Sequence, residues 1–252
     1  MPRLTDAQVE SFFERGFLVV TGVFAAGEIA EMRLAFARLQ RTAEHLGESR
    51  MFRGSQFVLG RGDRGQISIQ RIVWCGAAEP VLSEYGRDPK LLRLASTILG
   101  SAEMNQLINQ AHFKLPGDGV AFPWHQDSTH RRFGCGDWRD VNGKGSYVQT
   151  ATAIDDVTTN SGPLELIPGS SRLGHLGLSE EDSLPPAVLS HGTFAATMQA
   201  GDVLLFGPYT LHRSQPNVSD CPRRALINGF AYPGANSRVY PGKGAGRMLR
   251  YP

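Results

Sequence analysis

Hydrophobic positions in the first part of the chain recur at helical spacing. Ile29, Met32 and Phe36 are three or four residues apart, which predicts a long helix with one apolar face. The run FLVV at 17–20 precedes it and is expected to form a short strand. Residues 48–80 carry many arginines and glycines without a clear period, and we expect an irregular segment there.

Two further helices are indicated by their end signals. Thr5 followed by Gln8 is a capping-box pattern, and Gly16 can close the helix that it opens. A later run, PKLLRLASTIL, begins with Pro89 in its first turn and is followed by Gly100. The first hundred residues therefore read as mainly helical.

The pattern changes beyond residue 103 to short apolar runs separated by turn residues. Helices followed by many strands predict a mainly β fold, a double-stranded β-helix or jelly roll with the N-terminal helices packed on one face. We expect one domain over 1–252, with a helical part at about 1–102 and the β-helix core at about 103–235. The predicted strands lie in MNQLINQAHFKL, YVQTATAIDDV, GPLELIP, FAATMQ, DVLLFG and RALINGFAY.

Composition and charge narrow the class of partner. Of the 252 residues, 41% are hydrophobic and 20% are charged, and the net charge is only +2, which favours neither nucleic acid nor a membrane surface. Cys75, Cys135 and Cys221 lack metal-binding spacing and are expected to be free thiols. The first residues show no signal-peptide pattern, so we expect a cytoplasmic protein that acts on a small molecule.

The stretch FPWHQDSTH raises the question of a metal site. His125 and Asp127 are two residues apart, and on a strand such residues point to the same face. A third ligand is expected at His212, in the run DVLLFGPYTLH, because the intervening strands can bring it across a barrel. Two histidines and one carboxylate on one side of an iron ion are typical of non-haem Fe(II) oxygenases.

An arginine follows His212 in the sequence at a separation that suits a co-substrate site. Arg223 stands eleven residues after His212, with Ser214 between them. A guanidinium and a hydroxyl could bind the far carboxylate of 2-oxoglutarate, whose keto-acid end would chelate the iron. Arg224 is the alternative; neighbouring strand residues point to opposite faces, so one of the two arginines should be a surface charge.

These motifs resemble the phytanoyl-CoA dioxygenase-like (PhyH) family of Fe(II)/2-oxoglutarate-dependent oxygenases over nearly the whole chain. The resemblance implies that His125, Asp127 and His212 bind iron. It also implies that Arg223 and Ser214 bind 2-oxoglutarate and that His112, thirteen residues before the first ligand, contacts it as well. The segments that carry the resemblance are VESFFERGFLVVTGVFAAGEIAEMR, WHQD, NSGPLELIPGSSRLG and GDVLLFGPYTLHRSQPNVSDCPRRALINGFAY.

The resemblance further implies an enzyme that uses Fe(II), 2-oxoglutarate and O2 to oxidise a C–H bond of a small metabolite or natural-product intermediate. Asp127 favours hydroxylation, or desaturation or ring closure, because halogenating relatives carry a small residue there. A non-catalytic jelly-roll binding protein and a cupin-type enzyme without a co-substrate remain alternatives. Succinate formation with Fe(II), ascorbate and 2-oxoglutarate would discriminate between them.

The connection after the HxD motif could act as a lid. Residues 128–145 are rich in glycine and contain several cations, and they should leave the barrel near its mouth. Together with the arginines of 50–71, they would favour an anionic substrate. Solvated loop charges are the alternative. The candidate substrate contacts are Arg131, Arg132, Arg139 and Trp138.

Overall fold

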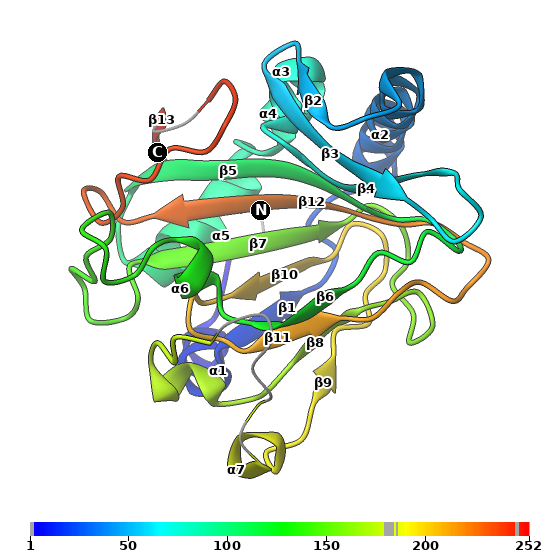
Figure 1. Cartoon of the computed structure of the whole chain (residues 1–252). Coiled ribbons are helices and arrows are strands. Elements are labelled where there is room, and N and C mark those ends of the chain that lie inside the picture. The colour runs from blue at the N-terminus through cyan, green and yellow to red at the C-terminus, as the bar shows by residue number, and fades with distance from the viewer. Residues whose placement is uncertain (1–2, 179–183, 185, 245–246, 252) are drawn as a thin grey trace.

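The computed structural model describes residues 3–178, 184, 186–244 and 247–251, whose strands form two antiparallel sheets (Figure 1). The large sheet contains, in spatial order, β1 (Phe17–Val20), β10 (Val203–Phe206), β7 (Tyr147–Ala153), β12 (Arg223–Ala231), β5 (Glu103–Lys114), β4 (Ile67–Val73), β3 (Ser55–Arg61) and β2 (Arg50–Phe52), with β13 (Arg247–Arg250) also paired to β5. The small sheet contains β6 (Phe122–His125), β11 (His212–Ser214), β8 (Leu164–Leu166) and β9 (Phe194–Ala195).

The helices end where the sequence signals place them. In α1, the side chains of Thr5 and Gln8 bond each other's backbone N–H groups, and Gly16 adopts a φ of 87° after the last turn. The later helix α5 starts after Asp88, whose side chain accepts a hydrogen bond from the backbone of Lys90. The helical segments are α1 (Asp6–Arg15), α2 (Ala26–Leu46), α3 (Cys75–Ala78), α4 (Pro80–Tyr85), α5 (Pro89–Leu99), α6 (Asp127–His130), η1 (Ser170–Leu173) and α7 (Pro186–Leu189).

Alternation along the central strand β12 divides the interior into two cores. Leu226 and Phe230 belong to the core that the large sheet shares with α2 and α5. Ala225 and Ile227 point to the other face and join a second core with residues of the small sheet, such as Leu166. The helices therefore cover one face of the large sheet, and its other face is free to line a site. The predicted fold class is confirmed by this architecture.

The expectation of an irregular segment at 48–80 is wrong. Strands β2, β3 and β4 occupy much of it and extend the large sheet beyond β5, so the N-terminal part of the chain is not only helical. The pairing of β3 with β4 shifts register between Val58 and Leu59. Such a bulge breaks the alternation of apolar and polar residues by which a strand is recognised.

The state of the cysteines and the character of the helices can be checked in the described residues. Cys75, Cys135 and Cys221 are all free thiols, as the sequence predicted, and Cys75 is buried. Among the helices that the structure describes, none combines the length and the apolar character needed to cross a membrane.

Packing of α2 on the large sheet should be a principal source of stability. Phe36 is fully buried, and its ring lies 5.2 Å from that of Phe113 on β5. Replacing Phe36 by Ala should lower the free energy of unfolding by about 3–5 kcal/mol, because a cavity remains. On the same helix Leu34 is 62% exposed, and Leu34→Ala should change it by less than about 0.5 kcal/mol. Urea denaturation of both variants measures the difference; equal effects would contradict this packing.

Candidate metal and 2-oxoglutarate site

The two predicted histidine ligands lie opposite each other on neighbouring strands. His125 ends β6 and His212 begins β11, and the antiparallel register pairs the two residues directly. Their ring centroids are 4.1 Å apart. His212 is buried, and the edge-on ring of Phe206 packs against it with 4.8 Å between centroids. Backbone pairing therefore brings together two residues that are far apart in the sequence.

Asp127 reaches the same place from a helix and not from a strand. The sequence predicts that His125 and Asp127 share one strand face, but β6 ends before Asp127, which opens the one-turn helix α6. Gln126 is fully buried between them, and its amide nitrogen donates to the carbonyl oxygens of Gly174 (2.8 Å) and Tyr209 (2.7 Å). These bonds fix the turn that carries the carboxylate towards the histidines.

The hydrogen bonds of both imidazoles leave one nitrogen of each ring available. Nδ1 of His125 lies 2.7 Å from the carbonyl oxygen of Pro123, and Nδ1 of His212 lies 2.9 Å from that of Thr210. A carbonyl oxygen can only accept, so Nδ1 carries the proton in each ring. Burial lowers the pKa of His212 to about 3, which keeps this ring neutral. Nε2 then presents a lone pair, as a metal ligand must.

Asp127 is a buried carboxylate with one unsatisfied oxygen. Burial alone would raise its pKa, but the charge of Arg131, helped by the nearby histidines, lowers the pKa below its ordinary value. Oδ1 lies 3.6 Å from Nη2 of Arg131. Oδ2 is buried and has no hydrogen-bond partner among the described residues. An anionic oxygen in this position is costly unless a cation satisfies it.

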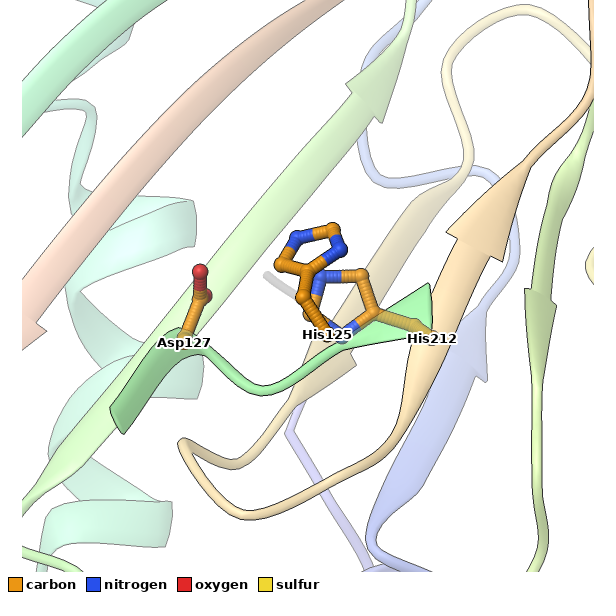
Figure 2. A group of neighbouring side chains, drawn as sticks. All are labelled: His125, Asp127 and His212. Atoms are coloured by element: carbon orange, nitrogen blue, oxygen red, sulfur yellow. The ribbon is translucent and has the colours of Figure 1, made fainter. Parts of the chain in front are cut away.

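Figure 2 shows the three side chains converging from β6, α6 and β11. Each offers one ligand atom, and these atoms lie within 4.8 Å of one another. Two neutral imidazole nitrogens and one ionised carboxylate are the donor set of mononuclear non-haem Fe(II) sites. The unpartnered Oδ2 of Asp127 and the free Nε2 atoms make these residues suitable to hold Fe(II).

A cavity of about 360 Å³ adjoins the three side chains and is lined by both sheets. The predicted 2-oxoglutarate contacts His112, Ser214 and Arg223 all line it. Lys114 lies opposite Arg223 in the pairing of β5 with β12, and its ammonium group donates to the carbonyl oxygen of Ser214. Arg223 and Ser214 therefore lie at the same end of the cavity.

The two adjacent arginines of β12 point to opposite faces, as the alternation predicted. Arg223 is buried, and its Nε has no partner among the described residues. Burial lowers the pKa of Arg223 to about 10, so it stays charged at neutral pH. Arg224 forms a two-point ion pair with Asp155, with both N–O distances 2.8 Å. Of these two adjacent arginines, Arg223 is therefore the one available to an anion in the cavity.

The four predicted substrate contacts are placed very differently. Arg131 is buried beside Asp127 and lines the cavity. Arg132 and Arg139 are exposed outside it, and Arg132 pairs with Asp137. Trp138 is buried and stacks on Tyr209 with 6.1 Å between centroids; it is not among the described residues of the cavity wall. The structure therefore brings one of the four into the site.

Arg131 is held by residues that no sequence pattern connects with it. Its guanidinium donates to the hydroxyls of Tyr240 (2.6 Å) and Tyr147 (2.9 Å) and to Oε1 of Gln149 (2.7 Å). The sequence motifs also do not indicate several other polar residues of the wall, although Gln110 lies two residues before His112 and therefore on the same strand face. These residues are Gln56, Gln110, His130, Gln149, Arg238 and Tyr240.

With this geometry established, comparison with known proteins identifies the family. Residues 12–225 match the model of the phytanoyl-CoA dioxygenase (PhyH) family. The chain belongs to this family of Fe(II)- and 2-oxoglutarate-dependent oxygenases. The family resemblance and the enzyme class inferred from the sequence are both confirmed.

Individual relatives support the same assignment. An L-proline trans-4-hydroxylase from Streptomyces griseoviridis is 29% identical over 197 residues, which cover 66% of this chain and 68% of that protein. An ectoine dioxygenase from Bordetella bronchiseptica is 26% identical over 241 residues, covering 87% and 73%. The structure of EctD from S. alaskensis with 2-oxoglutarate and 5-hydroxyectoine matches with a TM-score of 0.75 at 21% identity, covering 98% and 86%.

The free energy of unfolding should depend on pH because His112 is neutral in the folded protein. Burial, together with the charges of Arg71 and Arg223, lowers its pKa from 6.5 to about 3. Between these values the unfolded chain binds a proton here and the folded protein does not, so stability is lost as the pH falls below about 6.5. In His112→Asn the slope of unfolding free energy against pH should decrease by up to about 1.4 kcal/mol per pH unit. Denaturation at several pH values measures it; an unchanged slope would show that the folded protein protonates His112 as easily as the unfolded chain does.

Proposed function

We propose that this oxygenase hydroxylates a C–H bond of a small molecule and that His125, Asp127 and His212 are its three iron ligands. The main support for this proposal is that one ligand atom from each of the two imidazoles and the carboxylate lie within 4.8 Å of one another. The hydrogen bonds on both Nδ1 atoms hold the rings in the tautomer that a metal requires. Arg131 keeps Asp127 ionised and therefore ready to bind a cation.

The proposal places 2-oxoglutarate between the iron ligands and Arg223. The guanidinium of Arg223 is buried, and its Nε has no hydrogen-bond partner within the described part of the chain; it would bind the far carboxylate, and the hydroxyl of Ser214 would add a hydrogen bond. Neutral His112 would complete this pocket; its Nε2 lies 3.0 Å from Oε1 of Gln110. Lys114, which donates to three backbone carbonyl oxygens, would keep the Ser214 segment in position.

Bound iron, 2-oxoglutarate and O2 supply the oxidising chemistry when present. The protein residues orient and enclose the reactants. The cavity lies between the two sheets, so substrate and co-substrate would be held with little access of bulk water. Hydroxylation is supported by the complete carboxylate-containing triad, and by two relatives whose names are L-proline trans-4-hydroxylase and ectoine dioxygenase.

The ligand assignment is tested by removing each ligand. His125→Ala, Asp127→Ala and His212→Ala should each lower Fe(II) affinity by at least about tenfold and abolish succinate formation, because three protein ligands hold the ion. Metal content after anaerobic loading and circular dichroism separate lost binding from lost folding. His175→Ala, which changes a histidine outside the triad, is the control and should bind iron normally. A triad variant with full metal content and activity would remove that residue from the ligand set.

The co-substrate assignment is tested by the two neighbouring arginines. Arg223→Gln should weaken binding of 2-oxoglutarate by about 3–5 kcal/mol, at least a hundredfold, because the far carboxylate would lose its buried partner. Arg224→Gln should leave this affinity unchanged and lower stability, because Asp155 loses its ion pair. Anaerobic titration of the metal-loaded protein and thermal unfolding provide the two measurements. The opposite ranking of the affinities would assign the carboxylate to Arg224.

A further inference from the structure

The wall of the cavity carries more positive charge than iron and 2-oxoglutarate require. Among its described residues are four arginines and a single carboxylate, Asp127. Arg131 is committed to that carboxylate, at 3.6 Å, and to its tyrosine partners. Arg223 is committed to the far end of 2-oxoglutarate in the proposed function. Arg71 and Arg238 also line the wall, and the proposed function assigns no ligand to either of them.

Arg71 faces the cavity from β4. It stands two residues before Val73, which lines the same wall, whereas Ile72 between them packs in the helix-covered core. In the register of β4 with β5, Arg71 lies directly opposite His112. Arg71, His112 and His130 all line the cavity, so the guanidinium and the two rings face the same space. The arginine is therefore part of the wall and not a loop charge in solvent.

Arg238 comes from a different part of the chain, the segment that follows β12. Its guanidinium lies over the ring of Tyr240, 4.5 Å from the centroid. The hydroxyl of Tyr240 is itself fixed, because it accepts from Arg131 and donates to the carbonyl oxygen of His130. Arg238 is half-buried and forms no ion pair with the residues that the structure describes. Its cation is thus held at the cavity wall with no ion-pair partner in the part of the chain that the structure describes.

We propose that Arg71 and Arg238 form an anion-binding subsite that receives a carboxylate or phosphate group of the substrate. This inference rests on the proposed function, which assigns Arg223 to 2-oxoglutarate. Two guanidiniums on one partly enclosed wall favour an oxyanion, because charge-assisted hydrogen bonds strengthen where water is scarce. Gln56 and Gln110 line the same cavity and offer neutral amide donors beside them. The site therefore selects a small molecule that carries a negative group away from the carbon to be oxidised.

The test uses two anionic probes and one neutral probe that share a cyclopentyl ring; the carboxylate and the carboxamide also share a planar shape. The full-length protein is loaded with redox-inert Mn(II) and saturating 2-oxoglutarate, and calorimetry then follows cyclopentanecarboxylate, cyclopentyl phosphate and the neutral cyclopentanecarboxamide. At least one of the two anions should bind about tenfold or more tightly than the carboxamide. Arg71→Gln and Arg238→Gln should each remove most of this preference. Arg132→Gln, a change to an exposed arginine outside the cavity, should retain it.

The outcomes separate this inference from the proposed function. Titration of 2-oxoglutarate alone comes first; failure to bind it contradicts the proposed function, and the anion preference is then measured with Mn(II) alone. Equal binding of anions and carboxamide, or no binding of either anion, overturns the subsite. So does a preference that survives in both arginine variants. If the phosphate binds and the carboxylate does not, or the reverse, the result identifies which oxyanion the subsite takes.

Discussion

The antiparallel pairing of β6 with β11 sets His125 directly opposite His212, and the arrangement of the site depends on this register. Side chains alternate between the faces of a strand, so a slip by one residue would turn one imidazole away from the other. Contacts on both sides of the β6–β11 pair hold this register. β8 pairs with β11 through three consecutive residues, and buried Gln126 fixes the chain just after His125. Backbone hydrogen bonds thus hold the proposed metal ligands in position as part of the fold itself.

Electrostatics prepare the same residues for binding. Burial keeps His212 neutral, whereas Arg131 keeps Asp127 ionised in the same small volume. Without that arginine, burial would favour the protonated acid, which binds metal poorly. Tyr147 and Tyr240 hold the guanidinium in place through their hydroxyls. The protonation states that the proposed iron site requires are therefore favoured by burial and by fixed neighbouring residues.

Much of this could be predicted from the sequence because the signals were local. The capping box at Thr5, the HxD motif and the alternation that separates Arg223 from Arg224 each depend on a few neighbouring residues. The strands at 50–73 were missed because a bulge interrupts their alternation. The sequence places Arg131 in a lid-like connection, as a candidate substrate contact or a solvated loop charge. Its burial could not be predicted, because its partners Tyr147 and Tyr240 lie far along the chain. Contacts of that kind arise from tertiary packing and leave no periodic pattern.

The place of β12 in the large sheet has a consequence for how the chain is made. This strand, Arg223–Ala231, joins β7 on one side to β5 on the other, yet it is among the last strands in the sequence. At a translation rate of about 5–20 residues per second, several seconds pass between the synthesis of β7 and that of β12. During this time the edges of β5 and β7 that later pair with β12 have no hydrogen-bonding partner strand. Nascent chains are thus exposed to intermolecular strand pairing until the central strand leaves the ribosome. More chaperone, or a lower growth temperature, should accordingly raise the yield of folded protein.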